Sequence, residues 1–230
     1  MRVLVVTAVR AEADAVSDGL GAATERRLPG GYVLASHSGA DVLAAGVGPA
    51  AAAAGTATAL AVASPYDLVV SAGIGGGFQP LAPVGSLVVA DSIVAADLGA
   101  ETPEGFLPVD ELGFGRTVHH PPPEFAARVA GLLDAVHAPV LTVSTVTGSA
   151  ARAAELTARH PRAAAEAMEG FGVAEAAAAY AVPVVEIRAV SNAVGPRDRS
   201  AWRIGQALES LRYACRQLSP VFEKSPWESP

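Results

Sequence analysis

Hydrophobic and polar positions along this chain follow two alternating patterns. Short runs of β-branched and other apolar residues, typical of buried strands, come between segments whose apolar positions recur at helical spacing. The strand pattern covers residues 2–8, 32–38, 41–45, 67–71, 85–91, 139–145 and 184–190. The helical pattern covers residues 12–20, 50–63, 124–136, 149–160 and 172–180. This alternation predicts a single α/β domain, with one mixed and largely parallel central sheet flanked by layers of helices.

The segments outside these runs complete the predicted domain, which spans residues 1–220. Residues 97–123 carry many glycines and prolines, so we expect a long loop there. A last helix follows, and either Asp198 or Ser200 could cap its N-terminus. Its expected apolar face consists of Trp202, Ala207, Leu208, Leu211, Cys215 and Leu218. Residues 221–230 form a polar tail that we expect to be loosely held.

The strand pattern at 184–190 is the most informative for function. It ends at Ser191 and Asn192, and the Gly195-Pro196 pair follows. Ligands of open α/β sheets bind just beyond the carboxyl ends of the strands, so Asn192 is placed where a substrate would be recognised. A primary amide there can both donate and accept hydrogen bonds, whereas an ionised carboxylate could only accept.

Composition narrows the class of protein. The chain has 230 residues, a formal net charge of −7 and a pI near 5.2, so the basic surface of a nucleic-acid-binding protein is absent. We find no signal peptide and no segment of membrane-spanning character. The single cysteine, Cys215, excludes an intramolecular disulfide and is interpreted as a packing residue. These features predict a cytoplasmic enzyme that binds neither nucleic acid nor membrane.

Candidate chemistry does not include a metal. None of the five histidines has a helical i,i+4 histidine partner, and the cysteine is alone. The run Gly73–Gly77 could approach a phosphate, but its spacing differs from nucleotide-binding motifs and favours a tight turn. Glu12 follows the first strand and is placed as a general base, although a solvated helix-start glutamate would look the same. Glu169 has small apolar neighbours, which suggests a buried carboxylate that needs hydrogen-bond donors such as a sugar diol.

Taken together, these segments resemble a known family. Ala8-x-x-x-Glu12, the glycine run at 73–77, residues 84–91, Ala167-Met168-Glu169 and residues 187–192 are similar in order and spacing to the nucleoside phosphorylase/hydrolase family. The chain resembles its methylthioadenosine/S-adenosylhomocysteine nucleosidase branch from residue 3 to about 218.

The resemblance implies a nucleoside phosphorylase-like fold, no cofactor and a homo-oligomer, with a homodimer expected. It implies that Glu12 is the base for the attacking water and that Met168 and Glu169 bind the ribose. By the same resemblance, Ile74 and Gly75 lie near the ribose and base, and Thr145 and Val146 line the purine slot. The substrate is then a small-molecule nucleoside.

Asn192 is the main departure, because that branch has an aspartate there which protonates N7 of adenine. An amide can instead donate to N7 and O6 of a 6-oxopurine, so Asn192 favours hypoxanthine or guanine. The run from Ser191 to Trp202 is similar to the futalosine hydrolases of menaquinone biosynthesis, which remove hypoxanthine from a nucleoside bearing a benzoate. Arg197 or Arg199 could bind that carboxylate, or both could be helix-start charges paired with Asp198.

Three alternatives stay open. The chain could be a methylthioadenosine/S-adenosylhomocysteine nucleosidase, against which Asn192 argues. It could be a purine nucleoside phosphorylase, which a phosphate requirement would reveal. It could also be a non-catalytic nucleoside-binding protein, against which Glu12 and Glu169 argue.

Overall fold

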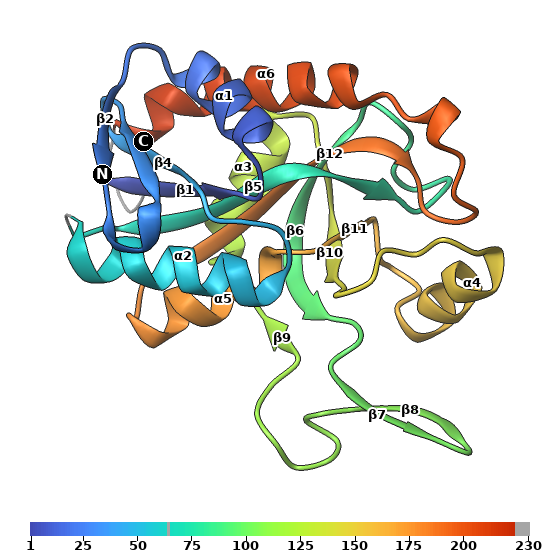
Figure 1. Cartoon of the computed structure of the whole chain (residues 1–230). Helices are drawn as coiled ribbons and strands as arrows, with labels where there is room; N and C mark the ends of the chain where they lie inside the picture. Colours follow the sequence, from blue (N-terminus) through green and yellow to red (C-terminus); the bar gives the residue numbers. More distant parts are fainter. Residues whose placement is uncertain (64, 224–230) are drawn as a thin grey trace.

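The computed structural model describes residues 1–63 and 65–223, which form one mixed sheet covered by helices on both faces (Figure 1). The sheet follows the order β11-β10-β6-β12-β5-β1-β4-β3-β2. Its strands are β1 (Val3–Thr7), β2 (Thr24–Arg27), β3 (Val33–Ser36), β4 (Ala40–Ala44), β5 (Leu68–Gly77), β6 (Leu87–Ala95), β9 (Val118–His119), β10 (Val136–Thr142), β11 (Ala165–Ala167) and β12 (Val184–Ala193). The predicted α/β class with a mixed central sheet is therefore confirmed.

Strand β5 organises the centre of the sheet. It pairs in parallel with β1 on one side and with β12 on the other. Its last two residues, Gly76 and Gly77, also pair with β11 in an antiparallel arrangement. Because β11 continues through β10 and β6 back to β12, these five strands close into a ring at one end of the sheet. The glycines at 73–77 lie inside this strand, so the prediction of a tight turn there is wrong.

Helices cover the two faces of the sheet in pairs. In Figure 1, α1 (Arg10–Leu20) and α6 (Ile204–Phe222) lie along one face, and α2 (Pro49–Val62) and α5 (Gly170–Ala179) lie along the other. The alternate residues of β1 are divided between the two faces, with Val3 and Val5 in one apolar core and Leu4 and Val6 in the other. Two further helices, α3 (Pro123–Leu132) and α4 (Ala150–Arg159), pack beside β10 and its neighbours.

Several boundaries differ from the sequence prediction. The helix expected at 124–136 ends at Leu132, and Val136 instead begins β10. The region expected as a loop contains the hairpin β7 (Gly99–Thr102) and β8 (Gly105–Pro108), which extends from the body in Figure 1, and the short strand β9. Strand β2 was not predicted, and all four of its residues are exposed.

The C-terminal helix also begins later than predicted. Asp198 caps a short 3₁₀ helix at Arg199–Ala201, through a bond from the Ser200 backbone N–H, and Ser200 itself lies inside that turn. Helix α6 starts only at Ile204, so Trp202 lies outside its apolar face. The helix continues through Pro220 to Phe222, whose side chain is buried against the core. The rest of the expected tail, 224–230, lies outside the described residues.

A membrane-spanning helix is absent from the described ranges, where every helix is too short or too polar to cross a bilayer.

Candidate active site

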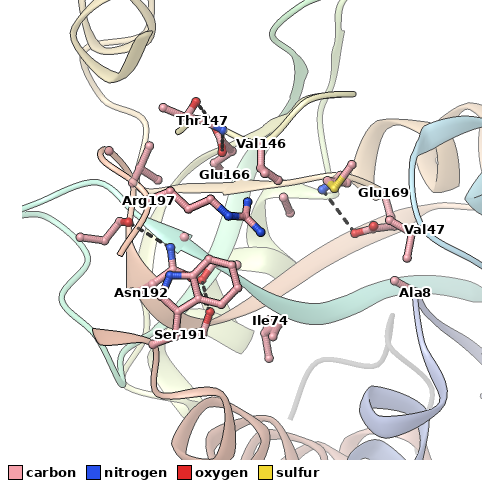
Figure 2. Close-up of a pocket in the computed structure, with 18 of the residues that line it drawn as sticks. Ala8, Val47, Ile74, Val146, Thr147, Glu166, Glu169, Ser191, Asn192 and Arg197 are labelled. Atoms are coloured by element: carbon pink, nitrogen blue, oxygen red, sulfur yellow. Dashed lines mark hydrogen bonds between the residues drawn. The ribbon is translucent and has the colours of Figure 1, made fainter. Parts of the chain in front are cut away.

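A cavity of about 370 Å³ opens where β1, β5 and β12 end and β11 meets β5 (Figure 2). Most of the predicted site residues line it, and they come from segments far apart in the sequence. The lining includes Glu12, Ile74, Gly75, Val146, Met168, Glu169, Asn192 and Arg197. Thr145 and Arg199, which were also predicted, are not among the lining residues. The carboxyl ends of neighbouring parallel strands meet at one edge, and this explains why such distant residues converge.

Glu12 lies in the first turn of α1 with a buried carboxylate that three backbone N–H groups hold in place. Its Oε1 accepts from the Ile74 N–H at 2.9 Å, and its Oε2 accepts from the N–H groups of Ala8 and Val9 at 3.0 and 3.3 Å. Burial raises the pKa of Glu12 above its ordinary value, and the Ile74 bond and the nearby Arg188 charge oppose that rise. A carboxylate with a raised pKa in a cavity has the properties of a general base.

Glu169 follows β11 at the start of α5, on the same cavity as Glu12. Its Oε1 accepts from the Gly48 N–H at 3.3 Å, and its Oε2 accepts from the Met168 N–H at 3.3 Å. The side chain is buried, as its small apolar neighbours suggested. A buried carboxylate beside open cavity space can accept hydrogen bonds from a ligand diol.

Arg188 of β12 is buried next to the cavity without lining it, and its side chain links β12 to β5. Its buried guanidinium donates from Nη1 to Glu169 Oε2 at 3.3 Å, from Nε to Glu186 Oε1 at 2.8 Å and from Nη2 to Ser71 Oγ at 3.0 Å. This rigid fork holds the Glu169 carboxylate in one orientation. The sequence prediction missed Arg188, because an arginine in an apolar run has no linear signal for a buried role.

Two glycines are required by this buried charge cluster. A Cβ at Gly73 would lie 2.6 Å from Arg188 Nη1 and 2.8 Å from Glu12 Oε1. A Cβ at Gly170 would lie 2.2 Å from Glu186 Oε2, an oxygen that has no hydrogen-bond partner among the described residues. Burial raises the pKa of Glu186, while the Arg188 charge acts in the opposite direction. The glycines therefore admit the ionic side chains into the space between β5, β12 and α5.

Asn192 lies near the end of β12 with its amide fixed by two neighbours. Its Oδ1 accepts from Ser191 Oγ at 2.8 Å, and its Nδ2 donates to the Ala193 carbonyl at 2.9 Å. An amide nitrogen carries two N–H donors, so one N–H of Asn192 is left for a ligand in the cavity. The predicted role of Asn192 as a donor to a base would fall to that remaining N–H.

Arg197 and Trp202 form one wall of the cavity beyond Asn192. The Arg197 guanidinium carbon lies 5.1 Å from the centre of the Trp202 ring, a cation–π distance. Arg199 lies on the 3₁₀ turn at 5.9 Å from the same ring. Of the two arginines predicted to bind a carboxylate, only Arg197 lines the cavity.

The segment after β10 lines the cavity next to Arg197, whose backbone N–H donates to the Gly148 carbonyl at 3.3 Å. Val146 lines the cavity as predicted, but Thr147 takes the place expected for Thr145. Thr147 donates from its backbone N–H to Glu166 Oε1 at 2.8 Å and from its hydroxyl to Glu166 Oε2. Glu166 also lines the cavity, and the sequence prediction missed it because alternating alanines and glutamates around 163–169 gave no sign of a strand.

Among the described residues, no group of three or more His, Cys, Asp or Glu side chains could hold a metal ion. The chemistry available is that of two buried carboxylates, an oriented amide and an arginine around one cavity. That set can deprotonate a water, bind a diol, hydrogen-bond a heterocycle and pair with an anion.

Comparison with known proteins identifies the family. The model of the phosphorylase superfamily matches residues 3–219. The chain belongs to this superfamily. The predicted family resemblance is thereby confirmed, and so is the nucleoside phosphorylase-like fold.

Individual members of the superfamily are similar over almost the whole chain. Futalosine hydrolase of Streptomyces coelicolor is 62% identical over 228 residues, which cover 97% of each chain. The solved structure of futalosine hydrolase from Helicobacter pylori matches with a TM-score of 0.82 at 18% identity, covering 96% of this chain and 98% of that one. A methylthioadenosine/S-adenosylhomocysteine nucleosidase of Colwellia psychrerythraea in complex with adenine matches with a TM-score of 0.79 at 24% identity, covering 97% and 93%.

Proposed function

We propose that this protein is a futalosine hydrolase, which cleaves the N-glycosidic bond of futalosine to release hypoxanthine and dehypoxanthine futalosine in menaquinone biosynthesis. The main support is that Glu12, Glu169 and Asn192 line the same cavity. The chain is also 62% identical to a futalosine hydrolase. A water, a ribose and a 6-oxopurine each find a suitable partner there.

Glu12 takes the proton of the attacking water in this proposal. Its carboxylate accepts three backbone hydrogen bonds, which fix its position without a neutralising salt bridge. The water attacks C1′ as the glycosidic bond lengthens and the ribose gains positive charge. General-base assistance of this kind contributes about 10²–10⁴ in rate.

Glu169 and Met168 hold the ribose in this proposal, with Ile74 and Gly75 beside it. Arg188 keeps the Glu169 carboxylate in place, so the ribose hydroxyls meet a rigid acceptor. Fixing the sugar relative to Glu12 lowers the entropic part of the barrier.

Asn192 stabilises the leaving base by donating its remaining N–H toward N7 and O6 of hypoxanthine, as a single hydrogen bond shared between the two acceptors. Ser191 Oγ donates to the amide oxygen and the Ala193 carbonyl accepts one of the two amide N–H groups, so one N–H is left for the base. Arg197 pairs with the benzoate of the substrate, and the adjacent Trp202 ring supports that guanidinium. Arg199 does not line the cavity and contributes only a more distant positive charge to the binding of the same carboxylate.

A base-release assay tests this function. Purified protein is incubated with futalosine, inosine or methylthioadenosine, each with and without phosphate, and the released base is quantified. We expect hypoxanthine from futalosine at a rate that does not depend on phosphate. Preferential release of adenine from methylthioadenosine would overturn the proposal, and a stoichiometric phosphate requirement would identify a phosphorylase instead.

The family also leads us to propose a homodimer or a higher homo-oligomer working in the cytoplasm. Apolar side chains of the extended segment around β7 and β8 support an oligomer, because Leu107, Leu112 and Phe114 are exposed on it. The single buried thiol of Cys215 fits a reducing compartment. Light scattering coupled to size exclusion measures the oligomeric state, and a monomeric mass would contradict the proposal.

A further inference from the structure

Glu166 is a buried acid on the cavity that the proposed reaction does not yet use. Its residue is 5% exposed, and burial raises the pKa of its carboxyl while the two Thr147 bonds oppose that rise. Burying a carboxylate is costly unless hydrogen bonds compensate it. Thr147 supplies two such bonds, one to each oxygen. Each carboxylate oxygen can accept a further bond, so Glu166 retains acceptor capacity on the cavity side.

The sheet register places Glu166 opposite Asn192 across a single glycine. On one side of β5, Glu166 pairs with Gly76, and on the other side Asn192 pairs with the same Gly76. Neighbouring strands lie about 4.7–4.9 Å apart, so the backbones of β11 and β12 stand roughly 10 Å apart here. Figure 2 shows Glu166 with Thr147 on one side of the cavity and Asn192 with Ser191 on another.

Gly76 lies between these two side chains, at a position where a larger residue would crowd the cavity lining. It lines the cavity itself, and a Cβ there would lie 2.9 Å from Val194 Cγ2 and 3.4 Å from Asn192 Nδ2. A flat heterocycle in this cavity can meet one polar group at each end, because Glu166 and Asn192 both line it. One group, the Asn192 amide, can donate, and the other, the Glu166 carboxylate, can only accept when it is ionised.

This donor–acceptor pair matches the edge of a 6-oxopurine. That edge carries an N–H donor at N1 and acceptors at O6 and N7. With Asn192 donating toward O6 and N7, the N1–H needs an acceptor, and a buried N–H without one costs the desolvation of the group. Adenine carries an acceptor at N1, which an ionised carboxylate would repel.

We propose that Glu166 accepts a hydrogen bond from N1–H of the base and is a second specificity-determining residue beside Asn192. The inference rests on the proposed function for the identity of the base. Thr147 is a positioning residue in this arrangement, because its backbone N–H and hydroxyl fix the Glu166 carboxylate and favour its ionised form.

Glu166→Gln tests the proposal with the smallest change in shape. The amide oxygen can keep the bond from the Thr147 backbone N–H, which leaves an NH2 group where an acceptor was. We expect kcat/KM for futalosine to fall by about 10- to 100-fold, as for loss of a hydrogen bond to a charged group. The activity ratio should shift toward the 6-amino analogue of futalosine, because the new NH2 can donate to N1 of adenine.

Competitive inhibition by free bases gives a readout that a purely structural role would not move. Hypoxanthine and 1-methylhypoxanthine differ only at N1, where a methyl group replaces the hydrogen and removes the donor. Wild-type protein should bind hypoxanthine about 10-fold or more tightly than its methyl derivative, and Glu166→Gln should lose most of that difference. Thr147→Val, which removes only the hydroxyl bond, should reduce the preference to a smaller extent.

The outcomes separate this proposal from the proposed function. Equal loss of activity on the oxo and amino substrates, with the hypoxanthine preference retained, would reduce Glu166 to a structural role. If Glu166→Gln does not fold, equal binding of the two free bases by the wild type overturns the proposal without any variant. Absence of base release from futalosine would overturn the proposed function, while the inhibition measurement on the free bases would still decide the role of Glu166.

Discussion

At the scale of single residues, the Glu12 carboxylate depends on accepting hydrogen bonds at both oxygens. Glu12→Gln must turn its NH2 toward either the Ile74 N–H or the N–H groups of Ala8 and Val9, so one donor faces another. We expect kcat to fall by about 10²–10⁴ because the amide cannot accept the water's proton. We also expect a loss of about 1–3 kcal/mol in the free energy of unfolding. Steady-state kinetics and urea unfolding measure the two effects, and more than about a tenth of wild-type kcat would contradict the base assignment.

The raised pKa of Glu12 predicts a particular pH dependence. The residue must be ionised to act as a base, so kcat/KM should fall as the pH drops through its pKa in the free enzyme. Because burial raises that pKa, the fall should begin at a higher pH than for an exposed glutamate. A pH profile with futalosine measures this limb. An acid limb at the ordinary value for glutamate would show that Glu12 is solvated in solution or that another group is the base.

Asn192→Asp tests how the base is recognised. An ionised aspartate would present acceptors to the O6 and N7 acceptors of hypoxanthine, so we expect activity on futalosine to fall by about 10²-fold or more. Residual activity should shift toward the 6-amino analogue and toward lower pH, where a protonated aspartate can donate to N7. The measurement is kcat/KM for both substrates across pH. Wild-type cleavage of futalosine by this variant would remove Asn192 from base recognition.

At the scale of elements, the glycines of β5 leave space for side chains that come from neighbouring elements. Gly73 gives space to Arg188 and Glu12, and Gly76 lines the cavity. A sequence pattern cannot distinguish this strand from a turn, because glycine is typical of both. The glycine run forms a strand because β5 pairs with β11 on one side and β12 on the other. That pairing depends on residues about 90 and 115 positions away.

Gly73→Ala is expected to disrupt the site through this crowding. Its Cβ would lie 2.6 Å from Arg188 Nη1 and 2.8 Å from Glu12 Oε1, so the charged groups must move. We expect a loss of about 1–3 kcal/mol in the free energy of unfolding and a large fall in kcat. Gly131→Ala is the matched control, because that helical position has no atom within 4 Å of the new Cβ. The control should be neutral or stabilising by up to about 1 kcal/mol, and equal behaviour of the two variants in unfolding and kinetics would contradict the crowding argument.

The elements also show what the sequence could and could not predict. Strands β1, β4 and β12 have continuous apolar runs, and their approximate positions were predicted together with Glu12 and Asn192 at their ends. The region of β7 to β9 was not, since these strands are short, have weak alternation and lie among many turn residues. Glu166 and Arg188 were missed because their importance arises from contacts across strands, which no local pattern contains.

At the scale of the whole molecule, the first helix, α1, packs against the last described helix, α6. A Cβ at Gly19 would lie 2.5 Å from the Arg212 carbonyl oxygen and 2.9 Å from Cys215 Cβ, so the helices are in close contact there. Cys215 and Phe222 are buried in the same core as Val3 and Val5 of β1. Exposing the Cys215 thiol therefore requires separating the C-terminal helix from the body of the protein.

This burial makes Cys215 a reporter of opening of the native structure. Burial raises the pKa of its thiol to about 12, and the thiolate is the reactive form. We expect an Ellman-type reagent at pH 8 to label the native protein very slowly and the urea-unfolded protein at once. The chain has a single cysteine, so one label per chain is the complete signal. Rapid labelling of the folded protein would show that α6 opens locally without global unfolding.

A ligand of the cavity should slow this labelling, although Cys215 is not among the residues that line the cavity. A ligand that binds only the folded state stabilises it by RT ln(1 + [L]/Kd), about 2.7 kcal/mol at a concentration of 100 Kd. If labelling requires global unfolding, saturating hypoxanthine should therefore lower the labelling rate by about 100-fold under conditions where refolding outpaces the reagent. The Asn192→Asp variant, measured with and without hypoxanthine, is the control and should gain much less protection. If hypoxanthine leaves the labelling rate of the wild type unchanged, α6 separates from α1 while the cavity stays intact. In that case α1 and α6 do not unfold as one unit with the site.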